Sequence, residues 1–499
     1  MIRSALLGTY AALALQTLMG LATVPLFIKA FGAERYGYWG ALLGVVQYLW
    51  VLNFGMAQTV SSRISTRAHM GRDEVARIIE LGFSLYLRSC IPALVVLVPA
   101  TWLVPWASMF KLDGVAAREA MWTATALVGT FLVELPFTVF RAALRGLGGV
   151  GPERAISTVV SLLRLLSAAA FVWLPPSLWL AVIILSAANM FGHLCCFLYL
   201  RVHERIPVGL AVLQHQEGER REFRASGLWY LLIQVTGTAL WGSDPTLAGM
   251  LLDVRASGRA SVAWRAVSAV LNIATMTGAA IAPIIARQWA QGNSDQARVL
   301  ALKSTRLVAG IGTIGMLCLG GAFMPLFHAW LRTDALVPEA SVLVSYCAVG
   351  AVQSWVAIFE AFVVQAGEPR GLALCAVLDV TCKLALSVLL GSKLGLVGVP
   401  LGTLLGHLFT SVAYIFWAYA KQTSTPLLEC VSAIVKASLV PALAFLMVYF
   451  LSLKLSARTD DLAIVLRTLA SAALFCAVYY WSGLTPDLRA KLRFWQVQR

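Results

Sequence analysis

The stretch from residue 24 to residue 40, VPLFIKAFGAERYGYWG, decides the fold class. An apolar run that starts near residue 5 continues through it to Ile28, and a short polar link with Lys29 follows. A second apolar run starts at Gly37 and continues to about residue 60. Each run has the 20 or so residues that a spanning helix needs. The stretch therefore predicts a turn between two membrane-spanning helices.

The link itself has the residue types of a turn at a membrane surface. Gly32 and Gly37 suit a tight turn. Three aromatic side chains suit the aromatic belt found where helices leave the membrane, namely Tyr36, Tyr38 and Trp39. Lys29 is expected to extend toward the interface or to lie at the outer mouth of a cavity.

The same pattern repeats along the whole chain of 499 residues, which is 59% hydrophobic and only 13% charged. Backbone groups in lipid must bond internally, and no period-2 alternation of a barrel is present, so the runs predict helices. The first run is longer than the apolar core of a signal peptide, so a spanning helix is expected there. Fourteen helices are predicted, at 5–30, 37–60, 80–105, 118–140, 155–174, 177–200, 226–251, 262–286, 305–330, 341–366, 370–391, 394–419, 433–454 and 462–483.

The charge pattern predicts the membrane topology, and neither the cysteines nor the known motifs indicate a metal site or a catalytic site. The net charge of +15 comes largely from Lys and Arg in alternate links, which predicts that those links and both termini are cytoplasmic. The nine cysteines form no CxxC or Cys/His cluster, so no metal site is expected. A P-loop and an HExxH motif are both absent from the sequence, so neither ATP hydrolysis nor zinc hydrolysis is indicated.

An internal repeat organises the helices. The run AANMFGHLCCFLYL around His193 resembles LGTLLGHLFTSVAY around His407, and GVGPERAIS resembles QAGEPRGLAL at a similar offset. Both histidines are interpreted as packed, hydrogen-bonded residues. Six helices per repeat give two parallel bundles related by an axis along the membrane normal, which favours alternating access. The predicted domains are a six-helix lobe at 1–215, a second at 216–425, and two further helices with a basic tail at 426–499.

The sequence resembles the polysaccharide-transporter branch of the multidrug/oligosaccharidyl-lipid/polysaccharide (MOP) superfamily, the Wzx-type flippases of O-antigen and exopolysaccharide repeat units. The similarity lies in PLFIKAFGAERYGYWG and LNFGMAQTVSSRIS, in SDPTLAGMLLD and APIIARQWAQGNSDQAR, and in QAGEPRGLALCAV and GLVGVPLGTLLGHL. It implies a MATE-like bundle that moves undecaprenyl-diphosphate-linked oligosaccharide from the cytoplasmic to the periplasmic leaflet. A polysaccharide polymerase and a chain-length regulator would be its partners, and no cofactor is implied.

Three alternatives stay open. Lipid II flippases have a similar fold, but they carry arginines in the first helix, whereas residues 17–28 here contain none. Drug or cation exporters of the superfamily favour acidic cavities and twelve helices. A membrane glycosyltransferase or polymerase would need a larger external loop than any predicted here, so the protein is not expected to be an enzyme.

Charged residues inside a membrane cost at least about 2.5 kcal/mol, so each is a functional candidate. A diphosphate head group needs a basic, water-filled cavity to cross the membrane. Asp379 and Lys383 share one helix face, either as a mutually neutralising ion pair or as cavity residues. Glu134 is expected to pair with Arg164, and Asp244 with Arg265.

The predicted substrate cavity contains Arg164, Lys383, Arg265, Lys29, Gln234, Trp241 and Asn272. The candidates for ion pairing, or for coupling to a proton or sodium gradient, are Glu134, Asp244, Glu360 and Asp379.

Overall fold

The structure is a computed structural model that describes residues 2–53, 55–67, 70–207, 217–366, 369–455 and 460–484. These residues form helices and short turns, and no strand occurs among them. The chain divides into two compact units, unit 1 at residues 1–261 and unit 2 at residues 262–499. The predicted lobe boundary at 215/216 falls in residues 208–216, which lie outside the described residues, as does the predicted basic tail from residue 485.

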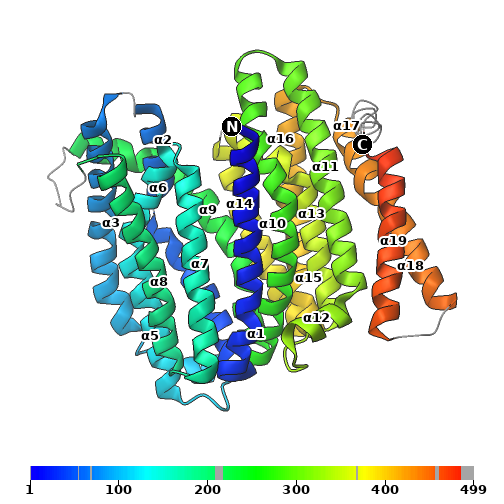
Figure 1. The fold of residues 1–499 in the computed structure, drawn as a ribbon, viewed down its shortest axis with the longest axis horizontal. Helices are drawn as coiled ribbons and strands as arrows, with labels where there is room; N and C mark the ends of the chain where they lie inside the picture. Colours follow the sequence, from blue (N-terminus) through cyan, green and yellow to red (C-terminus); the bar gives the residue numbers. More distant parts are fainter. Residues whose placement is uncertain are drawn as a thin grey trace. The chain divides into compact units, whose positions relative to one another are not determined.

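The described residues of unit 1 form nine α-helices and the first turns of a tenth (Figure 1). They are α1 (Ile2–Tyr48), α2 (Met56–Arg67), α3 (Arg72–Ala100), α4 (Trp106–Met109), α5 (Ala117–Glu134), α6 (Thr138–Gly146), α7 (Val150–Trp173), α8 (Leu178–Leu198), α9 (Glu217–Leu251) and α10 (Val254–Ala290).

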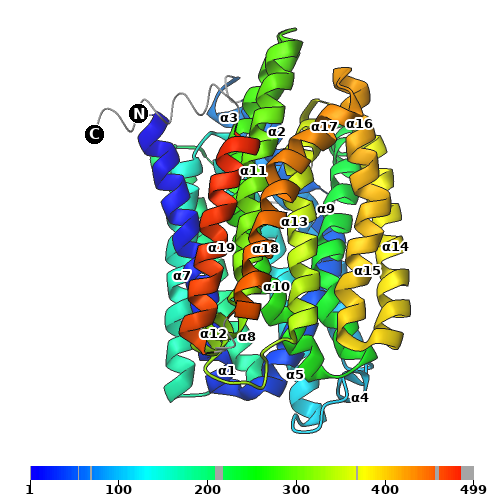
Figure 2. The same ribbon diagram turned by 90° about the vertical axis from the view of Figure 1, so that its right-hand side faces the viewer.

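Unit 2 contains the rest of α10 and the remaining helices (Figure 2). They are α11 (Ser294–Gly321), α12 (Phe323–Leu331), α13 (Ala340–Ala366), α14 (Pro369–Leu394), α15 (Gly398–His407), α16 (Ala413–Thr423), α17 (Leu427–Ile434), α18 (Val440–Leu455) and α19 (Asp461–Ser482). A π-helical turn at Leu408–Val412 joins α15 to α16, and another at Val435–Leu439 joins α17 to α18.

Ten stretches of the described residues are long and apolar enough to cross a membrane. Two of them, Ala14–Val46 and Gly371–Thr423, each contain a glycine with positive φ, Gly32 and Gly395. This confirms the all-α, multi-pass class. The count of fourteen spanning helices stays a prediction.

The opening stretch forms the break inside α1. Gly32 adopts φ 82°, the left-handed region in which glycine is favoured. Gly37, predicted for the turn, lies in the helix instead and packs against α10. A methyl group there would lie 2.0 Å from the Val254 carbonyl oxygen. Glycine at 37 therefore serves close helix packing.

The aromatic side chains after the break correct a second prediction. Tyr36, Tyr38 and Trp39 are buried inside unit 1, with exposed fractions of 1%, 0% and 5%, rather than forming an interfacial belt. Trp39 stacks on Phe27 with 4.4 Å between ring centroids, and the Tyr38 hydroxyl donates to the Ala120 carbonyl at 2.8 Å. The rings hold the two arms of α1 together and fix them to α5.

The polar residues of the link anchor the loop before α5. Arg35 donates to both carboxylate oxygens of Glu119, at 3.0 and 2.9 Å. The Glu34 carboxylate accepts the backbone N–H groups of Asp113 and Gly114. The link is therefore a structural joint within unit 1.

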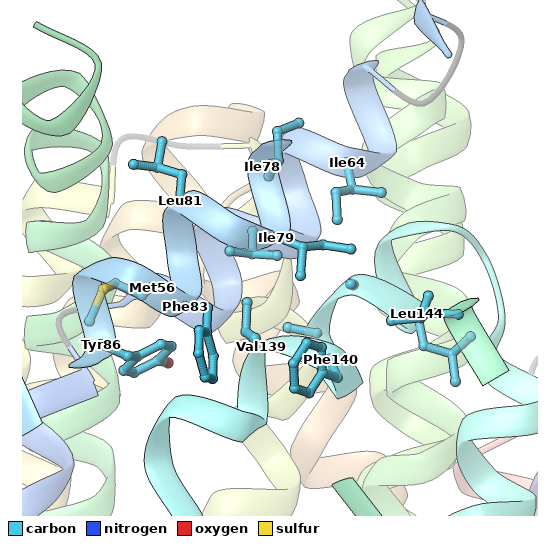
Figure 3. Packing of buried hydrophobic residues seen from close by; sticks show 14 of the residues in the cluster. Met56, Ile64, Ile78, Ile79, Leu81, Phe83, Tyr86, Val139, Phe140 and Leu144 are labelled. Carbon is cyan, nitrogen blue, oxygen red and sulfur yellow. The ribbon is translucent and has the colours of Figure 1, made fainter. Parts of the chain in front are cut away.

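The apolar core of unit 1 includes a cluster from α2, α3 and α6 (Figure 3). Ile79 of α3 and Val139 and Phe140 of α6 have exposed fractions of 1% or less. At its edge the Tyr86 hydroxyl donates to the Asn53 side-chain oxygen, so the buried polar atoms are paired.

In unit 2, α14 and α15 form an antiparallel hairpin closed at Gly395, whose φ is 68° (Figure 2). Glycines at every fourth position of α15 face α14. A methyl group would lie 2.1 Å from Leu390 O at Gly398, 2.3 Å from Ser387 N at Gly402, and 2.9 Å from Lys383 Cα at Gly406. Small residues at this spacing allow close backbone approach between membrane helices.

Candidate functional site

Unit 1 contains a cavity of about 130 Å³ between α1, α5, α7 and α8, lined by both polar and apolar side chains. Its polar lining comprises Trp39, Thr130, Glu134, Arg164, Ser186 and Asn189. Glu134 comes from the end of α5, Arg164 from the middle of α7, and Asn189 from α8. Asn189 Nδ2 donates to Glu134 Oε2 at 3.4 Å, and the other carboxylate oxygen, Oε1, has no hydrogen-bond partner in the described structure.

Glu134 and Arg164 thus line one cavity, and their pairing stays a prediction. A guanidinium in a confined, half-buried site can bind a phosphate oxygen through several N–H donors at once. The adjoining Glu134 offers an acceptor that can also bind a proton.

A second hollow, of about 480 Å³, shares Glu134, Thr130 and Ser186 with this cavity. It lies between α3, α5 and α8, and its other lining is almost entirely apolar, for example Leu94 and Ile183. The Glu134 carboxyl therefore lies where a cavity of mixed lining meets an apolar groove within unit 1.

Unit 2 contains a buried polar cluster where α13 meets the α14–α15 hairpin. His407 Nδ1 lies 2.7 Å from Asp379 Oδ2, and His407 Nε2 lies 2.9 Å from Gln353 Oε1. Gln353 Nε2 donates to Glu360 Oε2 at 2.9 Å. The predicted candidates Asp379 and Glu360 therefore belong to one cluster, joined by Gln353 and His407.

Lys383 lies one turn after Asp379 on α14 and is fully buried. The structure gives Asp379 a hydrogen-bond partner that the sequence interpretation did not assign, His407 on α15. The prediction that His407 is packed and hydrogen-bonded is confirmed, since both ring nitrogens have partners. His193, its counterpart in the repeat, is also buried, but its Nδ1 has no hydrogen-bond partner in the described structure.

The sequence interpretation missed Gln353. Its signal was available, because Gln353 and Glu360 are seven residues apart and so occupy the same face of α13, two turns apart. An amide at that spacing from a membrane carboxylate is a candidate bridging group.

The remaining candidates fall in different parts of the chain. Lys29 is exposed on α1, and Trp241 is half-buried on α9. Asp244 is buried on α9, near Tyr48. Arg265 is half-buried and Asn272 exposed on α10 in unit 2. The Gln234 side chain lies outside the described residues. The pairing of Asp244 with Arg265, and a shared cavity for these residues, stay predictions.

Among the described residues no cluster of three or more His, Cys, Asp or Glu could hold a metal ion. The nine cysteines are free thiols, mostly buried or half-buried.

No protein-family model matches the sequence. A curated relative, the uncharacterized membrane protein EpsK of Bacillus subtilis (strain 168), is 24% identical over 326 residues, which are 64% of this chain. The alignment covers 63% of EpsK, less than two thirds of its length.

Solved structures show the same fold. One described as lipid II flippase MurJ in an inward closed conformation has a TM-score of 0.72 at 12% identity, covering 95% of this chain and 98% of that one. An inward-facing multidrug resistance MATE family transporter of the MOP superfamily has a TM-score of 0.67 at 15% identity, covering 82% and 96%. A MOP superfamily transporter from Pyrococcus furiosus has a TM-score of 0.60 at 16% identity, covering 84% and 95%. The chain is therefore a multi-pass membrane protein with the fold of the MOP superfamily transporters, the fold of MATE and MurJ.

Proposed function

We propose that this protein is a flippase that moves undecaprenyl-diphosphate-linked oligosaccharide repeat units from the cytoplasmic to the periplasmic leaflet. The observation that carries the proposal is a fold shared, over 95% of the chain, with a structure described as a lipid II flippase. O-antigen, exopolysaccharide or capsule biosynthesis would use such a step.

Basic residues inside the membrane support a phosphate-bearing substrate. Arg164 lines the cavity of unit 1, and Lys383 is fully buried in unit 2. A guanidinium binds phosphate oxygens through several N–H donors at once, and an ammonium binds them as a point charge, so both side chains suit a diphosphate head group.

The proposal also covers the arrangement of the helices, the membrane that contains the protein, its energy source and its partners. Two six-helix lobes, at 1–215 and 216–425, alternate access to a central site, with two further helices at 426–499. The protein lies in the bacterial inner membrane with both termini in the cytoplasm, and it uses an ion gradient. A polysaccharide polymerase and a chain-length regulator act with it, and no cofactor takes part.

The direct test is reconstitution of the full chain in liposomes with undecaprenyl-diphosphate oligosaccharide that carries a fluorophore on the sugar. A membrane-impermeant quencher reports the fraction of probe in the outer leaflet. Exchange between leaflets should accelerate with the protein and not with empty liposomes. A diacyl phospholipid with the same fluorophore is the matched control, because it lacks the diphosphate.

Two competing probes separate the alternatives. Labelled lipid II tests the hypothesis that the substrate is lipid II, and an ethidium gradient tests the hypothesis of cation export. Faster flipping of lipid II than of the oligosaccharide lipid, or ethidium export without any flipping, would replace the proposed function. Release of free sugar from the lipid would instead indicate an enzyme.

A further inference from the structure

Four side chains in unit 2 form a continuous hydrogen-bonded chain, in the order Asp379, His407, Gln353 and Glu360. They come from three helices, α14, α15 and α13. Asp379 and His407 are buried, with exposed fractions of 1% and 4%, whereas Gln353 and Glu360 are only half-buried. The chain thus runs from the surface of unit 2 into its interior.

The Gln353 amide fixes where the protons are. Its oxygen faces His407 Nε2, so Nε2 must carry a proton and donate it. Its NH₂ group faces Glu360 Oε2, so that oxygen is the acceptor and carries no proton. One further proton lies between His407 Nδ1 and Asp379 Oδ2, 2.7 Å apart. With Glu360 ionised, the histidine–aspartate end holds two protons in this arrangement.

The same four side chains can also form the chain with the direction of each hydrogen bond through Gln353 reversed. If Glu360 holds a proton, it donates to the amide oxygen after the amide rotates by half a turn. The amide NH₂ then donates to His407 Nε2, and His407 Nδ1–H donates to Asp379. Both arrangements contain two protons, so one proton has moved from the buried end to Glu360 with no hydrogen bond lost.

The surrounding charges favour a proton over a metal cation. Among the described residues, the ionisable groups that act on one another here are Glu360 on α13, Cys375 and Asp379 on α14, and His407 on α15, and Lys383 is buried one turn after Asp379. Lys383 supplies a buried ammonium that has no lone pair for a metal. Its charge opposes a second cation nearby, while a single proton can be accommodated by either carboxylate.

We propose that this four-residue chain is the proton-coupling site of the transporter, with Glu360 as the entry and the Asp379–His407 pair as the buried end. The inference rests on the proposed transport function and names its coupling ion. Gln353 acts as a positioning residue that lets the two ends exchange one proton. Lys383 keeps the buried end from binding a sodium ion.

The test is infrared pH-difference spectroscopy of the purified full chain in liposomes of phosphatidylethanolamine and phosphatidylglycerol. It needs no lipid-linked sugar, so it can succeed even if the proposed substrate is wrong. The carboxylic-acid band lost in Glu360→Gln identifies Glu360, and its intensity between about pH 4 and pH 9 gives the proton affinity. We expect His407→Gln to change that affinity at least about threefold, because the two groups share one chain.

The amide provides the decisive variant. In Gln353→Leu both titrating ends remain, but the link is cut, so His407→Gln should no longer change the Glu360 affinity. Gln353→Met serves if the leucine variant does not fold. The matched control is His193→Gln, the related histidine of unit 1, which should leave the Glu360 band unchanged.

Three results would overturn the proposal. The first is a Glu360 band that does not titrate. The second is an effect of His407→Gln that is absent in the parent protein or that persists without Gln353. The third is a shift of the Glu360 midpoint when sodium chloride replaces choline chloride at constant pH, which would make the site a sodium site.

Discussion

Asp379 and His407 are 28 residues apart in the sequence, yet their side chains meet at 2.7 Å across the α14–α15 hairpin. The contact depends on Gly406, which precedes His407 and lies against the backbone of Lys383. A larger residue would push α15 away from α14. The polar cluster of unit 2 therefore rests on a purely steric feature of the helix pair.

Gly402→Ala should destabilise this hairpin. The new methyl group would lie 2.3 Å from the backbone nitrogen of Ser387, which cannot move without shifting α14. Overpacking of this kind costs about 1–3 kcal/mol. A lower thermal transition of the purified protein would show it. Gly20→Ala is the control, since a methyl group at Gly20 has open space and should not lower the transition. Equal transitions for the two variants would contradict the packing argument.

Arg164→Ala should impair flipping of the labelled oligosaccharide lipid while membrane insertion is retained. Loss of a charged hydrogen-bond donor costs about 1.5–3 kcal/mol, which corresponds to at least about tenfold in rate. The liposome assay at matched protein amounts measures it. Arg88→Ala removes an exposed arginine of α3 and should flip the probe at the parent rate. Parent-like flipping by both variants would remove Arg164 from the substrate site.

Phe140→Ala should weaken the core of unit 1. Phe140 has an exposed fraction of 1%, stacks on Phe83 and contacts Phe197 (Figure 3). Deleting such a ring typically costs about 3–5 kcal/mol through lost burial and the cavity left behind. Thermal unfolding in detergent checks the effect. Phe409→Ala is the comparison, because Phe409 is 78% exposed and its loss should leave the transition nearly unchanged.

The Arg35–Glu119 pair should contribute little to stability. Its side chains are 37% and 19% exposed, so solvent screens the attraction. Exposed pairs couple by about 0.2–1 kcal/mol. A double-mutant cycle with Arg35→Ala and Glu119→Ala, read by thermal or denaturant unfolding, measures the coupling. A value well above this range would mean that the joint between α1 and α5 is a main source of stability.

The sequence predicted correctly the features that depend only on residues within one helix or at one helix end. The break at Gly32 followed from the polar link between two apolar runs. The presence of buried charge on α14 followed from Asp379 and Lys383 inside an apolar helix. It failed for Gly37 and Tyr38, because their partners, Val254 and Ala120, are more than 80 residues away.

The sequence by itself determined an all-helical, multi-pass membrane protein. Apolar runs of spanning length leave no other way to satisfy backbone hydrogen bonds in lipid. Only the tertiary structure decided which residues of those helices meet. A membrane helix is apolar on the sides that face lipid and on the sides that face protein, so its pattern does not reveal the buried face. The link from Asp379 through His407 and Gln353 to Glu360 exists because three helices pack closely enough to join them.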